Sequence, residues 1–140
     1  MQKLISESFA ELHYDETLPC FVIRWIGFQK LEFTQPFCEK VVQTLSEIRI
    51  KNPKLTSFIG NTLHLEVLTP EIQNYWDKIW NPAMYNAGGR FLALIVPTSV
   101  FAQFSVEQYS DVMTEKLQEV KVRMFDDIEK AKEWLKTCQN

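Results

Sequence analysis

Apolar and polar residues alternate loosely over positions 8–14, and a nearly unbroken apolar run covers positions 20–26. Both patterns are typical of strands, and the second indicates burial on both faces of a sheet. Residues 15–19 lie between them and contain an Asp and a Pro, which favour a turn. We therefore predict an antiparallel hairpin that ends at Gly27.

A first helix is predicted after this hairpin. Thr34 offers a capping hydroxyl, and Pro36 would be tolerated in the first turn, where its missing N–H costs nothing. Asn52 precedes a proline and is therefore disfavoured in a helical conformation, so the helix should end there. Apolar residues recur every three or four positions and predict one buried stripe. The stripe consists of Phe37, Val41, Leu45 and Ile48.

A short strand over residues 55–59 and a second helix follow. Thr69 can cap this helix, with Pro70 at its first position. Pro82 interrupts the helical pattern, so a kink or break is expected near residues 80–82. The pair Gly88-Gly89 predicts a helix C-cap. The expected apolar face of the helix consists of Ile72, Tyr75, Trp76 and Ile79.

The rest of the chain alternates strands and helices. Residues 91–96 are apolar throughout, as in the middle of a parallel sheet, and residues 105–117 show a capping box and helical spacing. Alternation over residues 120–124 predicts an edge strand, and residues 126–135 predict a closing helix. The predicted order is ββαβαβαβα. We therefore expect one α/β domain over residues 1–140, with a mostly parallel central sheet, an N-terminal antiparallel hairpin and helices packed on the sheet.

Composition and charge narrow the possible partners. The net charge is −3, and basic residues are interspersed with acids, which disfavours nucleic acid and anionic membranes. The longest apolar stretch, residues 91–96, is too short to span a bilayer, so no stable membrane insertion is expected. The N-terminus does not read as a signal peptide, and three widely spaced cysteines fit reduced thiols. These features predict a cytoplasmic protein.

Several local sequences accompany this order of elements. They are the strand ending in Gly27, the strand end at 58–62, the Leu-Thr-Pro-Glu sequence at 68–71 before Trp76, residues 94–97 followed by 100–103, and the closing segment 125–135. Together they cover nearly the whole chain, which resembles the STAS fold of anti-sigma-factor antagonists (SpoIIAA-like proteins). More specifically, it resembles small stand-alone bacterial STAS-like domains, a group of largely unassigned function.

The resemblance implies a regulatory or protein-interaction function without catalysis. Signalling members of the family carry a phosphorylatable serine, in an Asp-Ser pair, at the start of the helix after the third strand. Residues 59–64 here read Ile-Gly-Asn-Thr-Leu-His, without that pair and with Thr62 as the nearby hydroxyl. Asn61 stands where the stand-alone group tends to have an acid. Both departures argue against a phosphorylation switch at this strand end.

Reactive side chains form no recognisable catalytic motif. His13 and Cys20 flank the hairpin turn, but a cysteine that opens an apolar strand is usually a small buried residue. The sequence contains neither a metal-ligand spacing nor a glycine-rich phosphate loop. Acids near helix starts, such as Glu71 and Asp126, are expected to complement the helix dipole. We therefore predict no enzymatic activity, no metal and no cofactor.

Aromatic residues, at 13% of the chain, give the remaining functional signal. Several follow predicted parallel strands, and open α/β sheets usually bind ligands at the carboxyl ends of such strands. These rings could fill the core, meet a partner or a second subunit, or line a cleft for a small hydrophobic or lipid-like ligand. The candidate cleft is bordered by Asn61, Thr62, His64, Trp76, Trp80, Ser99 and Phe101.

Three functional hypotheses therefore stay open. The first is a non-enzymatic regulatory module that binds a protein partner or a second copy of itself. The second is a carrier or sensor of a small hydrophobic ligand. The third, which the sequence favours least, is an enzyme that uses His64 together with Thr62 or Asn61.

Overall fold

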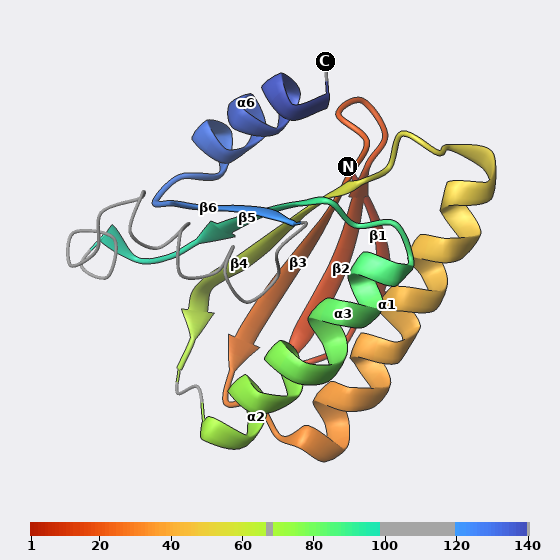
Figure 1. The fold of residues 1–140 in the computed structure, drawn as a ribbon. Helices are drawn as coiled ribbons and strands as arrows, with labels where there is room; N and C mark the ends of the chain where they lie inside the picture. Colours follow the sequence, from red (N-terminus) through yellow and green to blue (C-terminus); the bar gives the residue numbers. More distant parts are fainter. Residues whose placement is uncertain (67–68, 99–119, 140) are drawn as a thin grey trace.

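The computed structural model describes residues 1–66, 69–98 and 120–139, and these form a six-stranded mixed sheet with helices on both faces (Figure 1). The elements are β1 (Gln2–Ser6), β2 (Ala10–Asp15), β3 (Cys20–Gly27), α1 (Leu31–Lys51), β4 (Ser57–Leu65), α2 (Pro70–Tyr75), the π-helical turn η1 (Trp76–Trp80), α3 (Asn81–Asn86), β5 (Phe91–Ile95), β6 (Lys121–Phe125) and α6 (Ile128–Gln139).

The strands lie side by side in chain order, from β1 at one edge to β6 at the other. β1, β2 and β3 pair antiparallel, whereas β3, β4, β5 and β6 pair parallel. The predicted α/β class, the β2–β3 hairpin and the edge position of β6 are confirmed. The predicted helix at 105–117 lies outside the described residues. No helix in the described part of the chain is both long enough and apolar enough to cross a membrane.

β1 was not predicted, and it extends the N-terminal hairpin to three antiparallel strands. Its residues show no apolar–polar alternation, because Leu4 and Ile5 are adjacent. A bulge between Lys3 and Ile5 shifts the register with β2 and explains this pattern. One extra residue in a bulged strand disrupts the period of two on which sequence recognition of strands depends.

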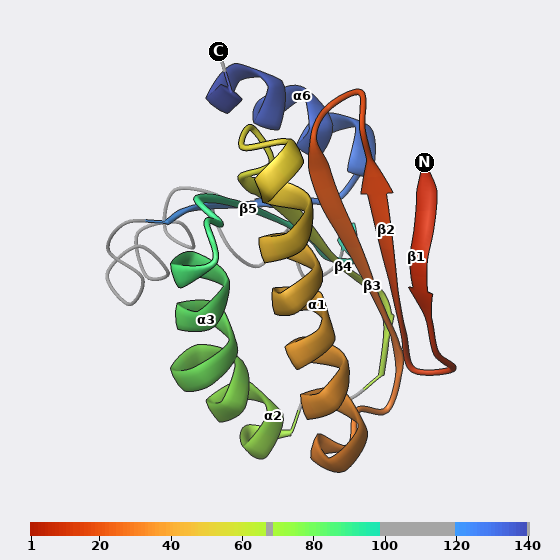
Figure 2. The ribbon, with the colours of Figure 1, turned by 90° about the vertical axis from the view of Figure 1, so that its right-hand side faces the viewer.

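The two faces of the sheet are covered unequally. α1 and the α2–α3 segment lie on one face, and α6 lies on the other (Figures 1 and 2). The stripe of α1 predicted from its spacing is buried on the first face, with Ile48 partly buried. On the second face, Ala131 and Leu135 of α6 pack against Val22 and its neighbours in the sheet. The core therefore consists of two layers separated by the sheet.

The start of α1 differs from the prediction. The helix begins at Leu31, so Thr34 is not its cap and Pro36 lies beyond the first turn. The Thr34 hydroxyl instead donates to Oε1 of Gln29 (2.9 Å), a side chain that is only 1% exposed. Gln29 in turn donates to the main-chain oxygen of Phe9 (2.9 Å). Thr34 thus satisfies a buried amide in the connection between β3 and α1.

The second helix neither breaks nor stops at Pro82. It passes through the π-helical turn η1, in which the Asn81 N–H bonds to the oxygen of Trp76, five residues earlier. The extra residue in this turn rotates the following positions around the helix axis. Ile79, predicted to lie on the buried face, is 58% exposed, and Trp80 takes the inward position at 7%.

The predicted glycine C-cap closes this helix. Gly88 has a φ of 117°, which is in the region that favours glycine. Its N–H bonds to the oxygen of Tyr85 (3.0 Å), and the N–H of Gly89 bonds to the oxygen of Met84 (2.8 Å). A Cβ atom on Gly88 would overlap the guanidinium of Arg49. Arg49 is held there by the main-chain oxygens of Leu55 (3.0 Å) and Ala87 (3.3 Å).

We expect Gly88→Ala to lower the free energy of unfolding by about 2 kcal/mol or more, because it adds this overlap to a strained φ. The matched control is Gly27→Ala. Gly27 also has a positive φ, 66°, but a Cβ there would meet nothing within 4 Å. The control should cost about 1 kcal/mol. Urea denaturation of both variants measures the difference, and equal losses would contradict the role assigned to Arg49.

Candidate functional site

The first three residues of the predicted cleft lie at the carboxyl end of β4. Thr62 Oγ1 donates to the main-chain oxygen of Ile95 on β5 (2.7 Å). Asn61 Oδ1 accepts from the N–H of Leu63 (3.1 Å), and His64 is exposed. Two of these polar groups therefore have local structural partners. Ser99 and Phe101 lie outside the described residues.

Trp76 and Trp80 lie elsewhere, on the face of the sheet covered by α1 and α2–α3. Both rings pack on Trp25 of β3, with centroid distances of 4.7 Å and 5.6 Å. Asn61 pairs in register with Arg24 of β3, the residue next to Trp25, and successive residues of a strand face opposite sides of the sheet. The structure thus brings the two tryptophans together but places them on the opposite face from Asn61.

Among the described residues, the buried indole nitrogens of Trp76 and Trp80 have no hydrogen-bond partner of normal geometry, although Trp76 interacts with the Cys38 thiol and opposes the rise in its pKa. Buried donors are usually paired in folded proteins, so each orphaned group calls for a physical reason. The rings themselves pack against neighbouring aromatic rings; the centroids of Phe58 and Trp80, for example, are 6.4 Å apart. An acceptor atom introduced beside Trp80 would therefore pair with a donor that has no partner among the described residues.

The cysteines are poor nucleophiles at neutral pH. Burial raises the pKa of the Cys20 thiol to about 12, and burial likewise raises the pKa of Cys38 and of Cys138. A reactive thiol needs the opposite shift. His13 does not pair with Cys20, because its cross-strand neighbour is Val22, while Cys20 faces Asp15. The prediction that Cys20 is a buried residue of the strand, and not a nucleophile paired with His13, agrees with this geometry.

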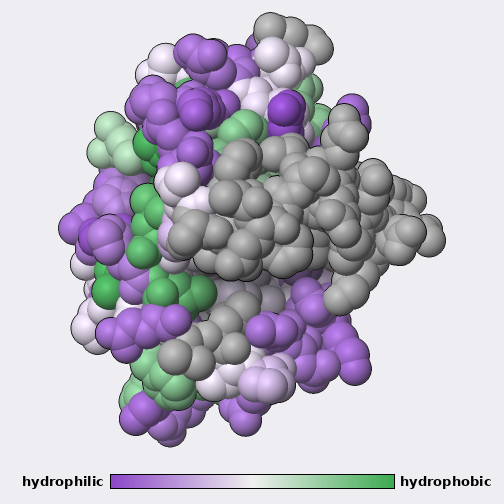
Figure 3. Space-filling view, turned by 90° about the vertical axis from the view of Figure 1, so that its left-hand side faces the viewer, coloured by the Kyte–Doolittle hydropathy of each residue, from purple (hydrophilic) through white to green (hydrophobic). Residues whose placement is uncertain are grey.

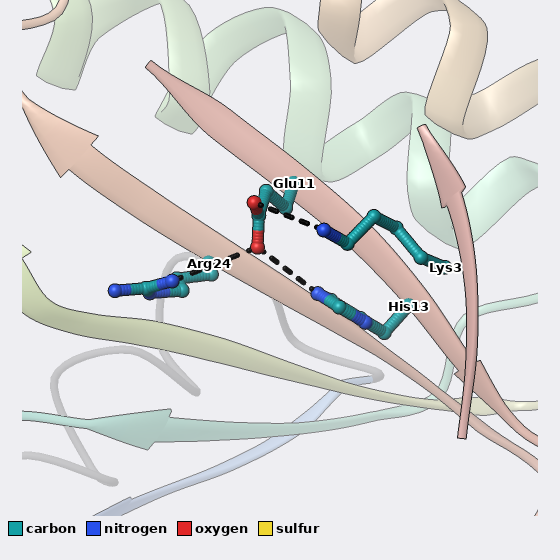
Figure 4. A network of polar contacts seen from close by, with 4 residues as sticks. All are labelled: Lys3, Glu11, His13 and Arg24. Atoms are coloured by element: carbon teal, nitrogen blue, oxygen red, sulfur yellow. Dashed lines mark hydrogen bonds and ion pairs between the residues drawn. The ribbon is translucent and has the colours of Figure 1, made fainter. Parts of the chain in front are cut away.

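A polar network that sequence reasoning missed surrounds Glu11 on the face opposite α1 (Figure 4). The Glu11 carboxylate lies 3.5 Å from Lys3 Nζ, 3.2 Å from His13 Nε2 and 3.6 Å from Arg24 Nη1. The hydrogen bond with His13, followed by the charge of Lys3, lowers the pKa of Glu11. Alternation places Glu11 and His13 on one face, but Lys3 and Arg24 join them only through the register of three strands.

A groove of about 490 Å³ runs between β6 and α6. The helix contributes residues at spacings of three and four, which is one stripe along its length. The aromatic rings of Phe125 and Trp134 lie 5.7 Å apart in the groove. The lining residues are Arg123, Met124 and Phe125 from β6, and Lys130, Glu133, Trp134 and Thr137 from α6.

A second depression, of about 400 Å³, lies at the carboxyl end of β3. It is lined by residues 28–32, at the start of α1, and by residues 69–71, at the start of α2. Glu32 and Glu71 occupy the first turns of these two helices and complement their positive ends. Among the residues that the structure describes, no three His, Cys, Asp or Glu side chains are grouped so as to hold a metal.

Comparison with known proteins assigns no family: no protein-family model, no curated protein and no solved structure matches the chain.

Replacement of Glu11 tests the polar network through its pH dependence. The folded pKa of Glu11 is below its ordinary value of 4.5, so its stabilisation is present above pH 4.5 and is lost as the pH falls through the folded pKa. Glu11→Gln should reduce the unfolding free energy at pH 7 by up to about 1 kcal/mol, and the difference from wild type should shrink towards pH 3. Urea denaturation at several pH values measures this difference. Glu16→Gln, at an exposed position in the next turn, is the control; a difference that persists at pH 3 would contradict the assignment.

Proposed function

We propose that this chain is a non-enzymatic regulatory or protein-interaction module of STAS-like type, and that a partner protein binds at the β6 edge. As part of this proposal, we assign it to the small stand-alone bacterial STAS-like domains that act in the cytoplasm. The order of its elements supports the STAS-like part, since a hairpin precedes parallel strands that alternate with helices. The observation that carries the interaction part is the outer edge of β6, which no described strand covers, beside the α6 groove.

On its outer side, the main chain of β6 presents groups that no described strand pairs with. The Lys121 N–H donates to the oxygen of Arg90, and the Phe125 oxygen accepts from the Val96 N–H, both at 2.9 Å. In a parallel strand, every second residue directs both its N–H and its C=O to the same neighbour, so residues 121, 123 and 125 bond to β5. The N–H and C=O groups of the intervening residues therefore point away from β5. No strand among residues 1–66, 69–98 and 120–139 pairs with that edge.

The groove makes this edge selective for a partner. An extended segment added to a sheet edge gains main-chain hydrogen bonds, and its alternate side chains enter neighbouring pockets. Here the pocket wall is the α6 stripe, and Trp134 and Phe125 supply an apolar floor. The main-chain groups of β6 thus provide affinity for an added strand, and the groove beside α6 provides selectivity for its side chains.

Several of the polar groups that could have suggested catalysis have structural partners, whereas His64 lies exposed at the end of β4. Thr62 holds the end of β4 against β5, and His13 is paired with Glu11. Burial keeps the Cys20 and Cys38 thiols protonated at neutral pH. These observations support a binding function more than a reaction.

A photoreactive residue in the groove tests the interaction. Thr137 is exposed and lines the groove, whereas Glu47 is exposed on α1, on the other face of the sheet. With benzoylphenylalanine at position 137, we expect a discrete cross-link to one protein in the native cells, and with the same residue at position 47 we expect none. Cross-links are identified by mass spectrometry. Their absence from position 137, or an identical pattern from both positions, would contradict partner binding at this edge.

A carrier of a small hydrophobic ligand is the second candidate, and the orphaned indole groups favour it. A ligand with an acceptor atom among its apolar groups would pair with Trp76 or Trp80 while its body contacts the aromatic cluster. Since Trp25, Trp76 and Trp80 are already in mutual contact, such a ligand would have to part these rings.

Native mass spectrometry of the purified protein separates the two candidates. The interaction module should show the mass of the chain alone under gentle conditions. A carrier should show a stoichiometric additional mass that is released on denaturation. If such a mass is found, Trp80→Phe, which removes the indole N–H and retains an aromatic ring, should reduce ligand occupancy.

A further inference from the structure

The β6 edge carries positive charge on the side that faces α6. Lys121 and Arg123 are both exposed, and Phe125 follows them at the same spacing of two. Alternate residues of a strand face the same side, so all three would lie opposite every second residue of an added strand. Neither Lys121 nor Arg123 belongs to an ion pair among the described residues. Within the described part of the chain, β6 therefore presents two cations without a carboxylate partner.

The positive charges that line the groove are only partly balanced by carboxylates. Lys130 is paired with Asp126, its neighbour one turn earlier, at 3.3 Å. Glu133 is the carboxylate among the groove residues. The guanidinium of Arg123 lies 5.5 Å from the centre of the Phe125 ring, which places a cation at the entrance to the apolar floor. Positive charge is therefore concentrated on β6, next to an aromatic pocket.

The surface around α6 does not suit a broad apolar partner. The top of Figure 3, where α6 lies, is mainly hydrophilic, with small hydrophobic areas between polar residues. Trp134 is itself only partly exposed. A partner would therefore bind mainly through the strand edge and its charges, with a single apolar side chain in the groove.

The same charges disfavour a second copy of this chain at β6. Two antiparallel β6 strands centred on residue 123 would bring Arg123 opposite its own copy. Centred on residue 122, they would bring Lys121 opposite Arg123. Like charges directly opposite each other on neighbouring strands are destabilising, whereas opposite charges stabilise the pair. Basic residues on an edge strand thus oppose self-pairing and favour an acidic strand.

We propose, on the basis of the interaction function above, that the β6–α6 groove binds an extended acidic segment of a partner protein as an additional strand. Two acidic side chains, separated by one residue, lie opposite Lys121 and Arg123. An apolar side chain at the next alternate position enters the groove over Phe125 and Trp134. The main chain of the segment bonds to the outward N–H and C=O groups of Val122 and Met124.

Synthetic peptides test this proposal with the full chain. The probes are fluorescently labelled Thr-Glu-Thr-Glu-Thr-Leu-Thr and the reversed sequence Thr-Leu-Thr-Glu-Thr-Glu-Thr, which cover parallel and antiparallel addition. The control peptides carry Lys in place of both Glu residues. Fluorescence anisotropy measures binding, and we expect micromolar affinity for one acidic peptide and no saturable binding of the Lys peptides.

Charge reversal on the protein provides the matched test. The double variant Lys121→Glu with Arg123→Glu should weaken binding of the acidic peptide about tenfold or more and should bind the corresponding Lys peptide instead. The control, Lys51→Glu with Lys54→Glu, makes the same change in net charge at exposed positions at the end of α1 and in the turn after it, and should leave binding unchanged. Circular dichroism establishes that each variant is folded.

N-methylated peptides distinguish strand addition from simple charge attraction. In an added strand, alternate N–H groups point towards β6. Methylation of the Glu residues and methylation of the intervening Thr residues should therefore differ, one series abolishing binding and the other leaving it intact. Equal effects of both series would overturn strand addition.

The outcomes separate this inference from the proposed function. If the acidic peptides fail to bind while position 137 cross-links a partner, the acidic-strand inference is wrong and the interaction function stands. If both experiments fail, the interaction function is wrong as well. Wild-type self-association in sedimentation velocity that the charge reversal alters would identify a second copy as the occupant and overturn the choice of an acidic partner.

Discussion

Burial of β3 on both faces is the constraint on which the rest of the structure depends. Phe21, Ile23 and Trp25 of this strand are buried on one side, and Cys20 and Val22 on the other. Residues 20–23 of this strand are apolar and buried towards both faces, and such a stretch must be covered by helices on both sides of its sheet. This requirement accounts for the opposite placement of α1 and α6, and for the central position of β3 and β4 between two more exposed edges.

The same constraint determines where chemistry is available. Under the helical cover, polar groups are buried and paired within the fold. The Thr34 hydroxyl donates to Gln29, and burial raises the pKa of the Cys20 and Cys38 thiols. Charged groups persist where the helical cover ends, around Glu11 near one edge and on β6 at the other. Binding at an edge is therefore better matched to this architecture than catalysis at its centre.

The hairpin, the buried stripe of α1, the glycine cap at Gly88 and the edge position of β6 could be predicted because local patterns determine them. Features that depend on the register between strands, or on a change in the number of residues per helical turn, could not be predicted from the sequence. The bulge in β1 hides its strand pattern, and the π-turn exposes Ile79 in place of Trp80. The candidate site was predicted least well. The Glu11 network requires the pairing of three strands, and the predicted cleft assumed that Trp76 and Asn61 share a face.

Charges on an edge strand have two effects that are usually considered separately. Lys121 and Arg123 make the pairing of identical edges unfavourable, and for a monomeric domain this alone would justify their presence. A purely protective edge, however, needs no pocket beside it, and β6 borders a groove with an aromatic floor. The main-chain groups of an open edge accept any extended segment with nearly equal affinity. Repulsion of basic strands and attraction of acidic ones then convert this general affinity into selectivity, since specificity is a difference between binding free energies. The combination of charge and groove is therefore better explained by recognition than by protection alone.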